Sequence, residues 1–430
     1  MGSLTRDIDP AYAEDEVVSR LRDELVEVSR DVVRPMGEAL DSLVGADYES
    51  IADADSPYWD VMDEIREVVP RRSFIPEEFG GDGMNGREFH ATLETLGWGS
   101  PGLAMGFAVD VMPALFATMS FDDDLVEEYV EPWLSGELDH QGCWGVTEPR
   151  HGSETLMVES LLKEGAGADD VPPPDVTATR DGDEYVIDGA KASWVTAAPM
   201  ATHCALHVDV DAARGSHGGL CLVELDRDGV TKGPPIDKIG QRDCPQGELV
   251  FDGVRIPERN MIMTPEMLHP DTGYVSFDQI LCFTSCGMAS VSAGLARAAF
   301  EEALEYARER EQAGKPIAEH QAVKLELYRM FEKVETARAY SRRVTEHVWS
   351  RTLESFEFDA SHAHALAAQV YCKRTAFEVA HKAVQIHGAN GITRDYPVEK
   401  MFRDARVKLI EDGTLDVLGL EAATDVVDGY

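Results

Sequence analysis

The segment spanning residues 143–154 carries backbone and side-chain groups that could hold a polar ligand. It begins as an apolar strand and then turns through Pro149, Gly152 and Ser153. Backbone N–H groups and hydroxyls exposed in such a turn suit the polar edge of a ring or a phosphate. Taken alone, the segment fits an ordinary strand–loop junction better than a binding site.

A second segment, residues 185–196, places the large aromatic side chain of Trp194 beside the hydroxyl of Thr196. A turn at Asp188-Gly189 leads into the strand that carries both side chains. The two residues could form a wall for a flavin ring. They could equally be a core aromatic and a cross-strand hydroxyl, and the residues alone favour neither interpretation.

Two later segments combine the end of a helix with groups that could bind phosphate. Arg310 lies near the end of a helical stretch that Gly314 ends and Pro316 stops. Its guanidinium could pair with a pyrophosphate, or it could complement the helix dipole. A long helix breaks again at the glycine-rich turn that follows Ile386.

The elements that must position these residues change along the chain. Helical spacing of apolar residues from Val17 to Val33 opens a predicted helical domain, residues 1–141. Short β-type runs between Asp-Gly turns predict an antiparallel β-barrel or sandwich over residues 142–262. Residues 263–430 return to long amphipathic helices and predict a bundle, so the fold class is α+β with several domains. The long C-terminal stretches are Gly294–Glu311, Gln321–Thr352 and Ser361–Ile386.

The charge of the chain is strongly negative. Asp and Glu number 80 against 39 Lys and Arg, which gives a formal net charge of −41. Such a chain repels itself in dilute buffer, and at molar salt the Debye length falls to about 3 Å and screens the repulsion. We interpret the composition as halophilic adaptation, with a merely acidic mesophilic protein as the alternative. Nucleic acid and anionic membrane surfaces are excluded as partners because both require a basic face.

The remaining composition indicates a cytoplasmic protein without a metal site. Seven scattered cysteines include no pair at zinc-type CxxC spacing, and we expect buried thiols in a reducing compartment. The N-terminus has no apolar signal core. Asp110 and Pro113 interrupt the apolar run of residues 102–119, which we expect to be a buried helix, so no membrane insertion is predicted.

The order and separation of these segments resemble the acyl-CoA dehydrogenase family. Each motif is weak by itself, but together they cover nearly the whole chain in one register. The early Pro76–Gly81 loop and the Phe251–Pro257 segment fit as well. The landmark motifs are Thr147-Glu148-Pro149 with Gly152-Ser153, Tyr185–Thr196, Arg310–Ile317 with His320-Gln321, Gln385–Gly391 and Tyr396–Arg406.

The resemblance implies an N-terminal helical domain, a middle β domain and a C-terminal four-helix bundle, with FAD between the last two. It also implies a homotetramer or a dimer. Residues implied to line the flavin are Trp144, Val146, Thr147, Gly152, Ser153, Trp194, Val195 and Thr196. Arg310 and Gln321 would contact FAD in a neighbouring subunit. Residues implied to hold the adenosine half are Gln385, Ile386, His387, Gly388, Ala389, Thr414 and Asp416.

The resemblance also implies a reaction, in which a carboxylate removes the α-proton of an acyl-CoA thioester while the β-hydride passes to flavin N5. The family commonly has a Glu directly before Gly-Thr, and here Asp412 precedes Gly413 and Thr414. Asp412 is therefore the implied base, with Ser153 and Gly413 beside the substrate and an electron-transfer flavoprotein as electron acceptor. The alternative is that the Asp-Gly pair only forms a turn.

The chain departs from the family pattern in ways that leave other functions open. Members with the base on the first bundle helix carry it just before an Arg, but these positions are Thr284 and Ser285 here. How CoA would be held is therefore open, with Arg150 or His151 as possible substitutes. An Asp at the base position is similar to nitroalkane oxidases, whose substrate carries no CoA. A third alternative is a flavin-binding protein without catalysis.

Overall fold

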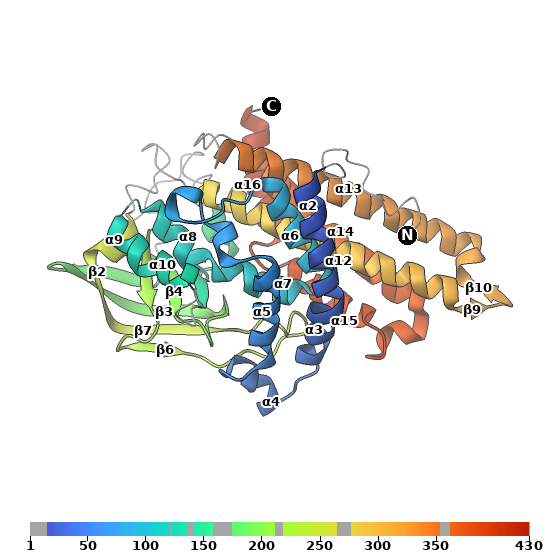
Figure 1. The fold of residues 1–430 in the computed structure, drawn as a ribbon, viewed down its shortest axis with the longest axis horizontal. Coiled ribbons are helices and arrows are strands. Elements are labelled where there is room, and N and C mark those ends of the chain that lie inside the picture. The colour runs from blue at the N-terminus through green and yellow to red at the C-terminus, as the bar shows by residue number, and fades with distance from the viewer. Residues whose placement is uncertain are drawn as a thin grey trace.

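The computed structural model describes residues 15–120, 122–135, 141–157, 174–210, 218–264, 277–352 and 362–429. The N-terminal helices, drawn in blue, lie against the long C-terminal helices, drawn in yellow to red (Figure 1). The green sheet lies beside them at one end of the molecule (Figure 1).

The N-terminal region is helical, as predicted. Asp15 caps the helix Glu16–Val28 by accepting hydrogen bonds from the backbone N–H groups of Val17 and Val18. Its central helix, α6, begins at a capping box formed by Asn85 and Glu88, and it packs against both α2 and α12. The elements are α2 (Glu16–Val28), a π-helical turn (Ser29–Val33), α3 (Arg34–Asp41), α4 (Ala46–Glu49), α5 (Pro57–Val68), α6 (Gly86–Gly99), α7 (Pro101–Asp110), α8 (Met112–Met119), α9 (Asp123–Leu125) and α10 (Glu131–Ser135).

The apolar run expected as one buried helix forms two, because the chain breaks at Val111 between α7 and α8. Two stretches in the described part of the chain, Pro101–Met119 and Gln279–Glu309, are long and apolar enough to cross a membrane. Their most apolar windows are 78% and 83% buried inside the fold, as expected of core helices.

The main sheet has the order β6-β7-β3-β2-β4-β5-β8, with β1 paired to β4. Most pairs are antiparallel, as predicted, but β1–β4 and β2–β4 are parallel, which corrects the prediction for these two pairs. A hairpin sets the direction only of consecutive strands, and β3 intervenes between β2 and β4. The strands are β1 (Gly142–Gly145), β2 (Thr177–Asp181), β3 (Glu184–Thr196), β4 (His203–Val210), β5 (Gly219–Glu224), β6 (Val230–Lys232), β7 (Gln246–Pro257) and β8 (Met261–Met263).

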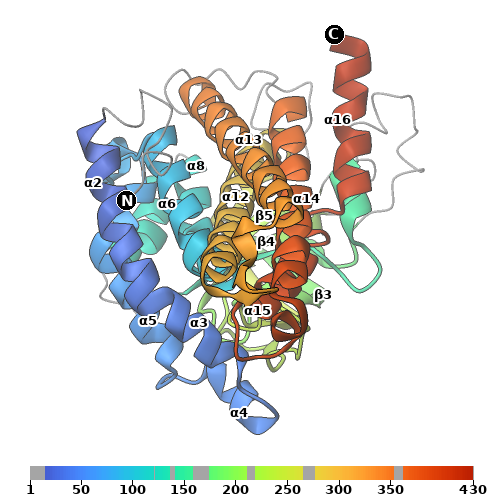
Figure 2. The same cartoon turned by 90° about the vertical axis from the view of Figure 1, so that its right-hand side faces the viewer.

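The C-terminal region is the predicted helical domain, in which α12 packs against α13 and α14, and α14 packs against α16. Figure 2 shows the three long helices side by side, with α16 ending at the C-terminus. All seven cysteines are buried free thiols, as predicted. The helices are α12 (Phe277–Glu309), α13 (Gln321–Thr352), α14 (His362–His387), α15 (Val398–Lys408) and α16 (Leu415–Gly429).

The predicted end of the first long helix at Gly314 is wrong. Helix α12 stops at Glu309, and residues 311–316 form the hairpin β9 (Glu311–Gln312) and β10 (Lys315–Pro316). Ala313 and Gly314 both have positive φ, at 52° and 81°, as a tight two-residue hairpin turn requires. Arg310 therefore follows the helix and precedes the hairpin.

Candidate active site

Asp412 lies in a tight connection between α15 and α16. Its φ is 51° and that of Gly413 is 91°, so two consecutive residues adopt left-handed backbone conformations. A side chain at Gly413 would lie 2.7 Å from Leu156 and 2.8 Å from Leu418, so only glycine fits there. The Asp-Gly pair therefore does form a turn, which was the alternative to a catalytic role for Asp412. This same turn positions the Asp412 carboxylate.

Two side chains of α14 hold this turn by its backbone. The fully buried Lys373 donates to the carbonyl oxygens of Glu411, Asp412 and Gly413 at 2.5, 3.4 and 3.2 Å. Gln369 donates to the Asp412 carbonyl oxygen at 2.9 Å. Sequence reasoning missed both residues, although a lysine on the apolar face of a predicted helix was a signal of a buried, paired charge.

Burial raises the pKa of Asp412 above the ordinary value of an aspartate, because the ionised form loses solvation. The positive charge of Lys373 opposes this shift, and the negative charge of Glu411 adds to it. A hydrogen bond from the Thr284 side chain also favours the ionised form. Burial in turn lowers the pKa of Lys373 to about 8. Asp412 thus has the environment of a carboxylate base.

Two cavities meet at Asp412. Cavity A, of about 640 Å³, is lined mainly by the N-terminal helices, α12 and Trp349 of α13. Cavity B, of about 730 Å³, is lined by the sheet domain and residues 406–413. The residues that line both are Met105, Val109, Trp144 and Asp412. A group held in one cavity can therefore contact a group held in the other, with the Asp412 carboxylate between them.

Cavity B gathers all of the residues predicted to line the flavin ring. These are Trp144, Val146, Thr147, Gly152, Ser153, Trp194, Val195 and Thr196, together with the predicted substrate residue Gly413. Sequence reasoning missed other polar members of the lining, which come from the loop before β7, from the first residue of β7 and from α15. They are Asp237, Lys238, Gln241, Gln246 and Arg406.

The donors in cavity B fit a flavin. In the part of the chain that the structure describes, the buried indole N–H of Trp144 has no hydrogen-bond partner. Trp194 keeps 58% of its surface exposed, although its ring is large and apolar. An unpaired buried donor and an open aromatic face suit a ring that carries polar edges and an apolar face.

The other predicted cofactor residues do not line either cavity within one chain. Arg310 and Gln321 are exposed beside the β9–β10 hairpin, and Asp416 is exposed in the first turn of α16. His387 is buried under Tyr306, with ring centroids 4.0 Å apart, and this burial lowers its pKa. The residues that end α14 and begin the next turn are Gln385, Ile386, His387, Gly388 and Ala389. The contacts of Arg310 and Gln321 with FAD in a neighbouring subunit stay predictions, and so does the binding of the adenosine half by residues 385–389, Thr414 and Asp416.

The loop after β1 is linked to the end of the Asp412 turn by a hydrogen bond from the Thr414 N–H to the Ser153 hydroxyl, at 3.1 Å. Arg150 and His151 are not among the residues that line the cavities, and Arg150 pairs with Asp175 instead. Ser285 is buried and donates to the Gln369 side chain at 2.8 Å. The hypothesis that Arg150 or His151 compensates for the absent Arg therefore has no support in the geometry.

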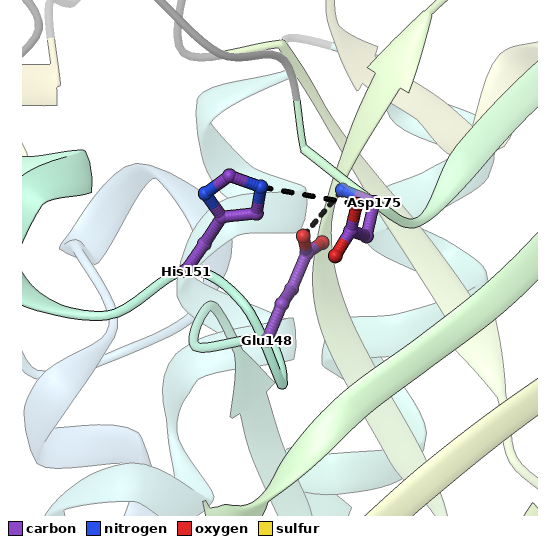
Figure 3. Close-up of side chains that lie close together, drawn as sticks. All are labelled: Glu148, His151 and Asp175. Carbon is purple, nitrogen blue, oxygen red and sulfur yellow. Dashed lines mark hydrogen bonds and ion pairs between the residues drawn. The ribbon is translucent and has the colours of Figure 1, made fainter.

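Glu148, His151 and Asp175 lie close enough together to resemble a metal site (Figure 3). The Glu148 carboxylate, however, accepts a 2.5 Å bond from Lys191, and both side chains are buried. It also accepts hydrogen bonds from the backbone N–H groups of Asp175 and Val176. The carboxylate is thus compensated by a lysine, and the cluster fixes the loop after β1 to the sheet.

Two family models match the chain: the acyl-CoA dehydrogenase middle domain over residues 143–254, and the C-terminal domain over residues 272–426. The chain is 32% identical to benzylmalonyl-CoA dehydrogenase from Aromatoleum aromaticum, covering 82% of this chain and 85% of that protein. It is 26% identical to 3-(aryl)acrylate reductase from Clostridium sporogenes, covering 88% of this chain and 94% of that protein.

The fold is also similar to that of a glutaryl-CoA dehydrogenase from Mycobacterium smegmatis in complex with FADH2. The TM-score is 0.76 at 19% identity, covering 97% of this chain and 95% of that chain. The two matched models account for more than half of the residues, and they include β1, α14 and the Asp412 turn. The chain belongs to the acyl-CoA dehydrogenase family of flavoprotein oxidoreductases.

Proposed function

We propose that this protein catalyses FAD-dependent α,β-dehydrogenation of an acyl-CoA thioester, with Asp412 as the base. Cavity B takes the flavin ring and cavity A takes the acyl group. The observation that carries the proposal is the position of Asp412 in the lining of both cavities. A carboxylate there can reach the α-carbon of a substrate whose β-carbon faces the flavin.

The residues of this chain supply the proton chemistry. Desolvation of Asp412 strengthens it as a base towards a weakly acidic α-proton. The Lys373 clamp keeps the turn in one conformation, so the carboxylate does not have to be oriented during each turnover. Bound FAD would supply the hydride acceptor. Trp144 would donate its free indole N–H to the cofactor.

Oligomerisation and electron transfer are part of the proposal. Arg310 and Gln321 lie exposed at one end of the long helices, where they are available to FAD in a second subunit of a homotetramer or dimer. Cofactor binding would then depend on assembly. A reduced flavin must pass its electrons on, and we propose an electron-transfer flavoprotein as the acceptor.

The test is an anaerobic titration of the FAD-loaded protein in molar KCl. Straight-chain, branched and ring-bearing acyl-CoAs are added in turn while the flavin absorption band is recorded. Bleaching by an acyl-CoA supports the proposal. A bound flavin that no acyl-CoA reduces contradicts it.

Nitroalkane oxidation is the second candidate, and the aspartate at the base position favours it. A nitroalkane has a more acidic α-proton than a thioester and needs no CoA site. Reduction of the flavin by a nitroalkane, with release of peroxide in air, would select this function. If neither acyl-CoAs nor nitroalkanes reduce the flavin, the remaining candidate is a flavin-binding protein without catalysis.

A further inference from the structure

Three aromatic side chains from three different helices meet in the lining of cavity A. Phe89 comes from α6, Phe283 from α12 and Trp349 from α13. The Trp349 ring lies 4.1 Å from that of Phe283 and 4.2 Å from that of Phe89, measured between centroids. Phe89 and Phe283 are 5.5 Å apart. We call these three residues the aromatic cluster.

One face of α12 forms part of the wall of cavity A beside the base, and Phe283 of the aromatic cluster lies one residue before its first member. Thr284, which lines cavity A together with Asp412, is followed on that face by Gly287, Met288 and Val291. The spacing i, i+3, i+4 and i+7 keeps these residues on one side of the helix, over a rise of about 10 Å. A substrate with its α-carbon at Asp412 would therefore extend its acyl group along this face.

Gly287 makes this wall flat beside the aromatic cluster. A Cβ at this position would lie 3.3 Å from the Leu93 side chain and 3.5 Å from the ring of Phe89. The glycine thus lets α12 approach Leu93 and the Phe89 ring closely, so that the ring of Phe89 lies directly against this wall. An aryl group in cavity A can pair with the rings of the aromatic cluster, which an alkyl chain cannot do, because ring pairs are stable when offset or edge-to-face.

The charge of the lining excludes acyl groups with a second carboxylate. Among the described residues that line cavity A, the charged ones are Glu77, Glu78 and Asp412, all acidic. A dicarboxylyl substrate would meet repulsion and no cationic partner. The indole N–H of Trp349 is already bonded to the Met84 carbonyl oxygen at 2.9 Å, so the aromatic cluster offers an apolar surface.

We propose that the substrate is a 3-arylpropionyl thioester without a second carboxylate and that the product is the 3-arylacrylyl thioester. This inference rests on the proposed dehydrogenase function. The Cα–H proton goes to the Asp412 carboxylate, the Cβ–H hydride goes to the FAD of that function, and the Cα=Cβ double bond forms. The new double bond is conjugated with the ring, which also stabilises Cβ as the hydride departs.

Binding of the product tests the inference without turnover. Calorimetry on the FAD-loaded protein in molar KCl compares cinnamoyl-CoA with trans-2-hexenoyl-CoA. We expect cinnamoyl-CoA to bind about tenfold more tightly, since ring pairing adds to apolar burial. Phe283→Leu should remove most of this preference. Trp349→Phe should retain it, because an aromatic ring remains. Trp59→Leu is the control, because Trp59 lies on α5 outside the lining of cavity A.

Reduction assays separate this inference from the function on which it rests. We expect 3-phenylpropionyl-CoA to bleach the flavin faster than hexanoyl-CoA does. If hexanoyl-CoA bleaches it and 3-phenylpropionyl-CoA does not, the aryl proposal is overturned and the dehydrogenase stands. Equal binding of the two enoyl-CoAs also overturns the aryl proposal. If no acyl-CoA bleaches the flavin, the dehydrogenase proposal fails, and the aryl proposal fails with it.

Discussion

The buried ammonium group of Lys373 donates to the backbone carbonyl oxygen of Asp412 at 3.4 Å. It also bonds the carbonyl oxygens on either side, so α14 holds the whole turn that presents the base. The same positive charge lowers the pKa of the Asp412 carboxyl, against the larger effect of burial. Lys373 is therefore a positioning residue that acts on both the conformation and the ionisation of Asp412.

Replacement of Lys373 by Met should slow flavin reduction and move the acid limb of the pH–rate profile to higher pH. The variant loses the charge that stabilises ionised Asp412, so the pKa of Asp412 rises. Stopped-flow reduction across pH measures this shift. Lys382→Met is the matched control, because Lys382 is exposed on the same helix. A variant that only loses thermal stability, with an unmoved acid limb, would show a purely structural role.

The stability contribution of Lys373 should itself depend on pH. Its pKa is about 8 in the folded protein and about 10.4 in the unfolded chain. Between these values the unfolded chain binds the extra proton, so this contribution to the unfolding free energy increases as pH rises. Urea unfolding at pH 7.5, 9 and 10 gives the unfolding free energies of the wild-type protein and of Lys373→Met. The difference between them should change in favour of the wild-type protein as pH rises. A constant difference contradicts the lowered pKa.

The rate of flavin reduction by the wild-type protein should fall at acid pH. The pH at which this rate is half-maximal should lie above the ordinary pKa of an exposed aspartate, about 3.9. The reason is that burial raises the pKa of Asp412 and a base acts only when ionised. Reduction rates under argon, measured at saturating acyl-CoA, give this midpoint. A midpoint at or below 4 would be incompatible with a desolvated base.

Asp412→Asn should retain bound flavin and lose roughly 10²–10⁴-fold in the rate of reduction, the usual contribution of a general base. The amide has nearly the same size but cannot accept the proton. Asp395→Asn is the control, and its flavin should be reduced at the wild-type rate, because Asp395 is exposed and outside both cavities. Near-normal reduction by Asp412→Asn would mean that another residue is the base.

Trp144→Phe should weaken FAD binding by about 2- to 10-fold, the value of one hydrogen bond. The buried indole N–H has no partner among the described residues, and we expect the cofactor to accept its bond. Fluorescence titration of the apoprotein with FAD measures the dissociation constant. Trp59→Phe, which leaves cavity B unaltered, is the comparison. An unchanged constant would mean that Trp144 does not bond the cofactor.

The melting temperature should rise between 0.1 and 2 M KCl if the acidic composition is halophilic adaptation, as we propose. With a net charge of −41, the folded chain repels itself most at low salt. Differential scanning calorimetry in KCl and NaCl makes the measurement. A melting temperature that is highest at low salt would indicate a merely acidic protein.

Periodicity was enough to predict the long helices, and the family resemblance implied residues that the folded chain brings together in cavity B. The stretch Gln321–Thr352 was predicted with the bounds that α13 has, because its amphipathic repeat and the preceding turn are local features. The motifs around Thr147 and Trp194 carried the family resemblance, and the residues that the resemblance implied there lie together in cavity B. The hairpin after Arg310 was missed because Ala313 adopts a positive φ that its residue type does not indicate.

The sequence by itself determined the order of helical and β regions, the family resemblance and the identity of Asp412 as the candidate base. Tertiary structure alone decided that Asp412 lies between two cavities, since α7, β1 and the 411–413 turn meet only in the folded chain. It also decided that Lys373 and Gln369 hold that turn. The physical reason is that periodicity reports which face of a helix is apolar, whereas the partner of a buried polar side chain depends on packing between segments distant in sequence.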